Sequence, residues 1–217
     1  MLLVRLCALA CLLAALNNAH ARAPRGQAGQ FDYYVLAMSW SPSYCATSHD
    51  PDQCDSGRRL GFVLHGLWPQ FENGYPENCS GARLPHDAVR RYAPLFPSPK
   101  LVGHEWRRHG TCSGLDPDSY FALSDKFRNQ LQIPAALRQP EAPVRLTPRQ
   151  FVHAFKNANP GMADGSVLPF CAGGGRFLRE LHACFAKDGR SRACSESSLR
   201  RSHNSCRDET FLIQNVR

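Results

Sequence analysis

The chain has 217 residues, of which 43% are hydrophobic and 20% charged, and its formal net charge is +8 at pH 7. This apolar content is sufficient for one core, whereas the length is short for several large domains. Composition therefore excludes a disordered chain, a fibrous protein and a multi-pass membrane protein. The positive charge favours polyanionic partners such as nucleic acid, or an anionic membrane surface.

The first 23 residues have the features of a secretory signal peptide. Arg5 supplies a positive charge, Leu6–Leu16 is an apolar run, and Ala21-Arg22-Ala23 matches the pattern of a cleavage site. The run is too short to span a bilayer, which needs about 20 apolar residues. We therefore expect a signal peptide at 1–23, a single domain at 24–217 and no membrane anchor.

Eight cysteines remain once this segment is removed. They are Cys45, Cys54, Cys79, Cys112, Cys171, Cys184, Cys194 and Cys206. An even number in an exported chain indicates disulfides, and eight cysteines allow 105 pairings. Zinc ligation is the alternative, but no two of these cysteines have the close spacing of a zinc knuckle.

The first half of the chain predicts two strands and two short helices. Phe31–Trp40 is rich in aromatic and apolar residues, and Leu60–Trp68 is a second apolar run that contains glycines. Glycine inside a strand often marks a bulge or a place of close approach. Residues 86–93 and 104–109 suit short helices, the second ending near Gly110.

The second half predicts two capped helices, and strands in the last third. Asp116-Pro117 is a favourable helix start, and we expect this helix to end near residue 131. The sequence from 147 to 150 fits a capping box, opening a helix that ends near 159–161. Strands are expected at 166–170, 176–185 and 210–216. The chain is thus predicted to be α+β, with a mainly antiparallel central sheet and helices packed to one side.

A first candidate site lies in the strand that contains His65-Gly66-Leu67-Trp68. A single histidine in an apolar strand is more often a core residue than a catalytic one. Here, however, the neighbouring Gly66 allows close backbone access and Trp68 offers an aromatic surface on which a base can stack.

A second candidate site is His104-Glu105-Trp106-Arg107-Arg108-His109. On a helix Glu105 and His109 are one turn apart and share a face, with His104 at its edge and Arg108 beside them. A solvated charged face is the alternative. A zinc protease motif needs its second histidine at position 108, which is arginine, so we reject it.

Two histidines with a carboxylate and a cation suit acid–base cleavage of a phosphodiester. A neutral imidazole removes a proton while a protonated one donates to the leaving oxygen. A cation offsets the charge that develops on the phosphate. If the nucleophile is the ribose 2′-hydroxyl, the chemistry needs no metal and is confined to RNA.

The segments HGLWPQ (65–70) and HEWRRHGTC (104–112) resemble the two signatures of the ribonuclease T2 family of secreted, largely base-nonspecific endoribonucleases. The resemblance extends from FDYYVLAMSWSPSYC (31–45) to the last cysteine. It implies an α+β fold, single-stranded RNA as substrate, and cleavage through a 2′,3′-cyclic phosphate followed by slower hydrolysis to a 3′-phosphate. It implies no cofactor and no metal.

The resemblance also implies residue roles. His109 corresponds to the general base and His65 to the general acid, while Glu105 would polarise the phosphate or orient His109. His104 and Arg108 would bind phosphate, and Trp68 would stack on a base. The family usually has lysine at position 108, and Gln70 stands where an acidic residue often helps to select the base.

The family's disulfide pattern, transferred to this chain, pairs Cys45 with Cys54, Cys79 with Cys112, Cys171 with Cys206 and Cys184 with Cys194.

Two other functions remain as alternatives: a non-catalytic RNA-binding or toxin-like module on the same scaffold, and a metal-dependent phosphodiesterase. We expect a monomer without an obligatory protein partner, in the periplasm or outside the cell.

The other histidines are predicted to be surface or packing residues, and the basic stretch 190–207 is predicted to be a solvated face. Those histidines are His49, His86, His153, His182 and His203.

Overall fold

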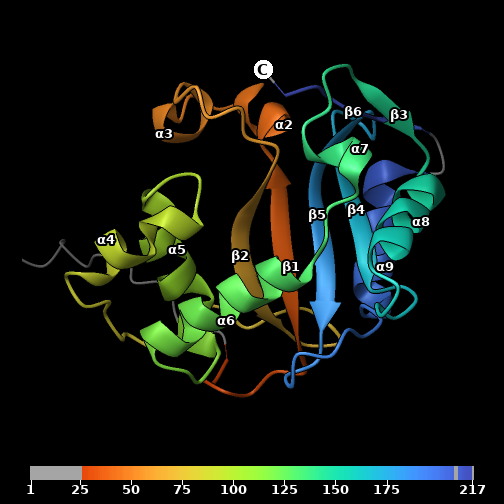
Figure 1. Ribbon diagram of the computed structural model, residues 1–217. Coiled ribbons are helices and arrows are strands. Elements are labelled where there is room, and N and C mark those ends of the chain that lie inside the picture. The colour runs from red at the N-terminus through yellow and green to blue at the C-terminus, as the bar shows by residue number, and fades with distance from the viewer. Residues whose placement is uncertain (1–25, 208–209, 217) are drawn as a thin grey trace, which may run out of the picture.

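The computed structural model describes residues 26–207 and 210–216, which form helices around one six-stranded sheet (Figure 1). The strands are β1 (Tyr33–Trp40), β2 (Phe62–Gln70), β3 (Val144–Leu146), β4 (Val167–Ala172), β5 (Phe177–Phe185) and β6 (Phe211–Ile213). The helices are α2 (Ser41–Cys45), α3 (Pro51–Cys54), α4 (Ala88–Tyr92), α5 (Lys100–Arg108), α6 (Pro117–Gln130), α7 (Ala135–Arg138), α8 (Pro148–Ala158) and α9 (Glu196–Cys206), with 3-10 turns η1 (Ala93–Leu95) and η2 (Gly110–Cys112).

The sheet has the strand order β2-β1-β5-β6-β3, and β4 also pairs with β5. All pairings are antiparallel except that of β5 with β6, which meet in parallel at one residue pair. The predicted α+β class with a mainly antiparallel sheet is confirmed.

The two faces of β1 pack into different clusters, because successive side chains on a strand point in opposite directions. Tyr34 and Leu36 belong to the main core, which also contains buried aromatic residues of α6 and α8. Tyr33 and Val35 belong to a smaller cluster on the opposite face, where Leu199 of α9 packs. The candidate site lies beside this smaller cluster.

The capping signals in the sequence correctly predict two helix starts. The Asp116 side chain accepts a hydrogen bond from the backbone N–H of Ser119 at the start of α6. Thr147 and Gln150 form the expected capping box of α8. The predicted strands at 31–40, 60–68, 166–170 and 176–185 correspond to β1, β2, β4 and β5, each within two residues at its ends.

Besides the predicted strands, the last third contains a helix that was not predicted, because α9 occupies Glu196–Cys206. Its start carries a cap that the sequence analysis missed: the Ser195 side chain accepts a hydrogen bond from the backbone N–H of Ser198. The buried residues of α9 are Ser198, Ser202 and Cys206, which do not give the apolar periodicity by which a helix is recognised in a sequence. The predicted helix at 104–109 begins earlier, at Lys100.

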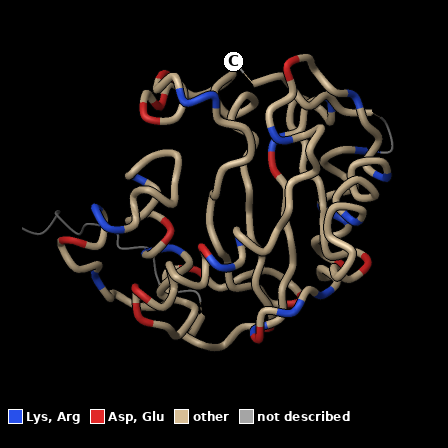
Figure 2. Tube along the Cα trace, in the orientation of Figure 1, with Lys and Arg blue, Asp and Glu red and all other residues tan. Residues whose placement is uncertain are grey.

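Lys and Arg are interspersed with Asp and Glu over the fold (Figure 2). Within the basic stretch, Arg190 pairs with Asp188 and Arg192 pairs with Glu72, so part of the predicted solvated face is charge-balanced.

The predicted signal peptide at 1–23 lies outside the described residues. Within the described parts of the chain, no helix is long and apolar enough to cross a membrane.

Four disulfides join the eight cysteines in the pairs that the family resemblance implies: Cys45–Cys54, Cys79–Cys112, Cys171–Cys206 and Cys184–Cys194. The second of these closes the segment that follows α5, because Cys112 lies at the end of η2.

Candidate active site

A β-bulge in β2 brings His65 and Trp68 to the same face of the sheet. Ala37 of β1 pairs with Gly66 and Met38 pairs with Leu64, so His65 is the extra residue. Side chains three residues apart on a regular strand would point to opposite faces, and a bulge corrects this by one residue. The glycine-containing run in the sequence indicated such a bulge.

Helix α5 and the residue after it carry the second motif. The backbone N–H of His109 donates to the carbonyl of Glu105 at 2.9 Å, which is the last helical bond. Glu105 and His109 are therefore one turn apart, as predicted. Trp106 anchors the helix from its other side by donating a hydrogen bond from Nε1 to the carbonyl of Ala82.

The two motifs meet at one cavity of about 700 Å³. Five of the six predicted catalytic and substrate-binding residues line it: His65, Trp68, His104, Arg108 and His109. The sixth, Glu105, is completely buried and lies behind the wall. The structure thus brings together residues that are about 40 positions apart in the sequence.

Trp68 lies at the centre of this group. Its ring stacks on His109 with centroids 5.1 Å apart and meets the edge of His65 at 5.0 Å. Its Nε1 donates a hydrogen bond to Oε2 of Glu105 at 2.8 Å. One indole therefore contacts both candidate catalytic imidazoles and the buried carboxylate.

The Glu105 carboxyl group has two different environments for its oxygens. Oε2 is held by Trp68, whereas Oε1 lies 3.9 Å from Nε2 of His65 and 3.9 Å from Nε2 of His104. Burial raises the pKa of Glu105 to about 7, against the opposing effects of His65 and the Trp68 hydrogen bond. Near neutral pH this group can exchange a proton with its surroundings.

The two candidate catalytic histidines have pKa values shifted in opposite directions. Burial, together with the positive charge of Arg108, lowers the pKa of His109 well below its ordinary value of 6.5. Burial would also lower the pKa of His65, but the hydrogen bond and negative charge of Glu180, with a contribution from Glu105, raise it on balance. These shifts favour the neutral form of His109 and the charged form of His65.

The two predicted phosphate-binding residues have different surroundings. Arg108 is anchored by an ion pair with the buried Glu77, at 2.8 Å between its guanidinium nitrogen and Oε2. His104 is more exposed, and burial together with the positive charges of His65, Arg107 and Arg108 lowers its pKa. Both side chains face the same cavity.

Glu180 was not among the predicted site residues, and His182 was expected to be a surface or packing residue. Both come from β5, line the cavity and are buried. His182 does pack, against Phe170 and Trp68, but its Nε2 also lies 2.9 Å from Oε2 of Glu180. The signal was a Glu and a His two residues apart in an apolar run, which places both on one strand face.

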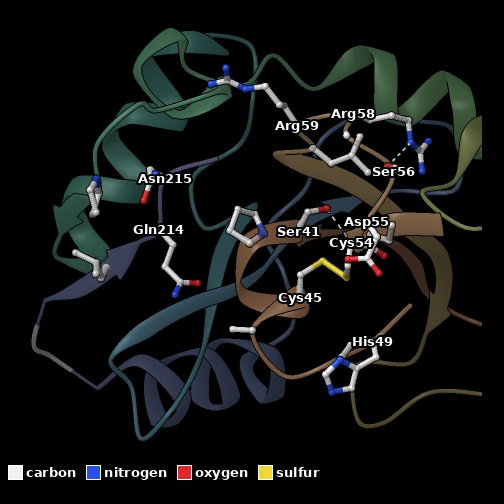
Figure 3. Close-up of a pocket in the computed structure, with 18 residues that line it drawn as sticks. Ser41, Cys45, His49, Cys54, Asp55, Ser56, Arg58, Arg59, Gln214 and Asn215 are labelled. Atoms are coloured by element: carbon white, nitrogen blue, oxygen red, sulfur yellow. Dashed lines mark hydrogen bonds between the residues drawn. A yellow bond between two sulfur atoms is a disulfide. The ribbon is translucent and has the colours of Figure 1, made fainter. Parts of the chain in front are cut away.

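A separate cavity of about 540 Å³ lies beside the Cys45–Cys54 disulfide, and His49, Arg59 and Gln214 contribute to its wall (Figure 3). It contains none of the predicted catalytic residues. Its Arg58 is engaged with the backbone carbonyls of Asp52 and Pro97. We therefore assign the chemistry to the larger cavity.

Among the residues that the structure describes, no group of three or more His, Cys, Asp or Glu side chains could hold a metal ion.

Comparison with known proteins finds similar ribonucleases. A ribonuclease of Aeromonas hydrophila is 40% identical over 199 residues, covering 89% of this chain and 90% of its own. Ribonuclease MC of Momordica charantia is 30% identical over 179 residues, covering 73% of this chain and 91% of its own. The solved structure of RNase MC1 from bitter gourd seeds superposes with a TM-score of 0.63 at 24% identity, covering 83% of this chain and 99% of that one.

The profile of the Ribonuclease T2 family matches residues 31–194. This range includes β1, β2, α5 and β5, which supply the cavity residues described above, and it ends before α9. The chain therefore belongs to the Ribonuclease T2 family of endoribonucleases.

Proposed function

We propose that this protein cleaves single-stranded RNA without a metal, using His109 as general base and His65 as general acid. The observation that carries the proposal is the opposite direction of the pKa shifts of these two imidazoles, which share one cavity. Environments that push two titratable groups apart in this way are typical of a base and an acid that act together.

In the first step His109 takes the proton of the ribose 2′-hydroxyl, and the 2′-oxygen bonds to phosphorus. The bond from phosphorus to the 5′-oxygen breaks, and His65 gives its proton to that oxygen. The products are a 2′,3′-cyclic phosphate and a 5′-hydroxyl. In the slower second step the roles reverse, and water opens the ring to a 3′-phosphate. DNA, which lacks the 2′-hydroxyl, is not cleaved.

Nε2 of His109 is the atom suited to the base role. Nδ1 of His109 is buried and has no hydrogen-bond partner among the described residues, so it cannot reach a substrate. The carboxyl group of Glu105 makes no hydrogen bond to the His109 ring, because its Oε2 is bound to Trp68 and its Oε1 faces His65 and His104. Of the two roles expected for Glu105, this favours polarisation of the phosphate, exerted through His65 and His104 because the carboxyl group itself is completely buried.

His104 and Arg108 supply donors for the phosphate oxygens, and Trp68, which lines the same cavity, stacks on a base. Gln70 is buried and its amide donates a hydrogen bond to the carbonyl of Pro69. Position 70 therefore presents no carboxylate to the cavity, which supports little base specificity. A solved relative, RNase NT, is described in complex with 5′-AMP, and a nucleotide in this cavity fits the proposal.

We also propose that the protein acts outside the reducing cytoplasm, in the periplasm or after secretion, as a monomer. Its four disulfides are typical of such compartments.

The test is cleavage of a short RNA in EDTA, beside the same oligomer with one 2′-deoxy substitution. We expect an early 2′,3′-cyclic phosphate product and no cut after the deoxy position. Cutting after the deoxy residue, or no cutting in EDTA, would contradict the mechanism and favour a metal-dependent phosphodiesterase. Binding of RNA without cleavage under any condition would favour the non-catalytic RNA-binding module.

A further inference from the structure

A carboxylate that the family motifs do not contain lies behind His65. Glu180 is buried at 6% exposure, and its Oε1 lies 2.6 Å from Nδ1 of His65. The same oxygen accepts a hydrogen bond from the Ser39 hydroxyl at 3.2 Å. Glu180 thus meets the ring of His65 at the nitrogen opposite to Nε2, which faces Glu105.

The fold fixes the direction of this carboxylate. Glu180 pairs with Ser39 across β1 and β5, and with Phe170 across β4 and β5. The register between β4 and β5 then shifts, which leaves Arg179 as an extra residue. Glu180 is next to this second bulge, and His65 is the extra residue of the first bulge. Both residues line the cavity.

The other oxygen of Glu180 is bound as well. Nε2 of His182 lies 2.9 Å from Oε2, and the His182 ring packs on Phe170 with centroids 4.1 Å apart. Burial lowers the pKa of His182 more than Glu180 raises it, which favours the neutral ring, and Nε2 is the nitrogen placed to donate to the Glu180 carboxylate. Three groups therefore surround the buried carboxylate: Ser39, His182 and His65. Ser39 and His182 hold it in place independently of His65.

We propose that Glu180 is a positioning residue for His65. It accepts the Nδ1 proton of His65 in a hydrogen bond, turns Nε2 toward the cavity as the atom that gives up its proton, and stabilises the charged ring. This inference rests on the proposed role of His65 as general acid and adds to it the residue that prepares the acid. His182 acts one step further away, by holding the second oxygen of Glu180.

The charges around the two partners agree with this assignment. Burial would raise the pKa of Glu180, but the hydrogen bonds and charges of His182 and His65 lower it below its ordinary range, so it is ionised whenever His65 works. From the other elements, His65 faces Glu105 and His104 of α5. Arg179 of β5 also contributes positive charge, and the charge of His65 in turn lowers the pKa of His109 beyond α5. Glu180 is the group that makes a hydrogen bond to the ring.

The first test compares Glu180→Gln with the wild-type chain on two substrates. An RNA dinucleotide has a poor leaving group and needs the acid, whereas a nucleoside 3′-(4-nitrophenyl phosphate) has a leaving group that needs little protonation. We expect Glu180→Gln to lower kcat/KM on RNA by about 10-fold or more, which is part of the roughly 100- to 10,000-fold contribution of general acid catalysis. On the activated ester it should lose much less.

The pH profile gives a second readout that a purely structural residue would not move. The high-pH limb of kcat/KM on RNA reports loss of the acid's proton. Without the negative charge of Glu180 this limb should shift to lower pH, and Glu180→Asp should restore it in part. An equal loss on both substrates with an unshifted limb would show that Glu180 is structural and overturn the inference. Glu141→Gln, at an exposed carboxylate, is the matched control.

His65→Ala separates failure of this inference from failure of the proposed function. If His65→Ala cleaves RNA as well as the wild type, the acid role itself is wrong. If it loses activity on RNA but Glu180→Gln behaves as the wild type, only the role of Glu180 is wrong.

One further measurement needs no folded Glu180 variant. The ¹⁵N NMR signals of the wild-type imidazoles, with His65 assigned from the spectrum of His65→Ala, report which nitrogen keeps its proton in the neutral ring. We expect Nδ1–H. An Nε2–H tautomer for His65 would overturn the inference.

Discussion

At the scale of single residues, Gly66 leaves the space that the Glu105 carboxylate occupies. A Cβ atom at position 66 would lie 1.8 Å from Oε2 of Glu105 and 2.6 Å from Nε1 of Trp68. These are the two atoms of the Trp68–Glu105 hydrogen bond. The close approach that the sequence indicates at Gly66 is therefore made by a buried side chain.

We expect Gly66→Ala to displace the Glu105 carboxyl group and lower kcat about 100-fold, the effect of a misplacement of about 1 Å in an active site. Overpacking should also cost about 1–3 kcal/mol of unfolding free energy. Steady-state cleavage of a dinucleotide and urea unfolding measure the two effects. Gly161→Ala, where a Cβ would meet nothing within 4 Å, is the control. A Gly66→Ala variant with wild-type kcat would show that the position of Glu105 is not critical.

At the scale of elements, α5 is held in place at its C-terminal end. The backbone N–H of Cys112 donates to the carbonyl of His109, and the N–H of Asn78 donates to the carbonyl of Arg108. The Cys79–Cys112 disulfide links these two segments covalently. The bridge thus fixes the backbone that carries His109 and Arg108 against the rest of the fold.

Replacing Cys79 and Cys112 together by Ser should therefore reduce kcat as well as stability. The Cys171–Cys206 bridge is a suitable comparison, because the sequence separations are 33 and 35. The loop-entropy estimate then gives nearly the same loss for both pairs, about 4 kcal/mol. We expect similar losses of unfolding free energy but a lower kcat for the Cys79/Cys112 variant, measured where both are folded. Equal kcat values in the two variants would exclude the positioning role of the Cys79–Cys112 bridge.

The elements that the sequence predicts well are those with local signals. The capping residues Asp116 and Thr147 locate α6 and α8, and the apolar runs locate β1, β2 and β5. The same holds for the site, since His65, Trp68 and the residues of α5 lie in two short motifs. Glu180 and His182 reach His65 through strand pairing across more than 100 positions. That register depends on two bulges and on packing, which no local pattern specifies.

At the scale of the whole molecule, the buried ionisable groups of the site affect the stability of the fold. Glu105 is completely buried, and its pKa is raised from 4.5 to about 7. Between these pH values the unfolded chain has lost the proton that the folded chain keeps. The free energy of the unfolded state therefore falls relative to that of the folded state as the pH rises, and the loss of stability is complete once the pH exceeds the folded pKa.

The consequence is a pH-dependent stability difference between the wild-type chain and Glu105→Gln. Gln cannot ionise, so the variant should become more stable relative to the wild type from pH 4.5 to pH 7. The total gain should be about 3 kcal/mol, at 1.36 kcal/mol per pKa unit. Urea unfolding of both proteins at pH 4 and pH 8 measures this gain. Any pH-independent effect of replacing the carboxyl group, which accepts the Trp68 hydrogen bond, enters the stability difference at both pH values equally. The exposed control Glu141→Gln should run parallel to the wild type. If Glu105→Gln also runs parallel, the Glu105 carboxyl group is ionised in the folded protein as readily as in water, and burial does not raise its pKa.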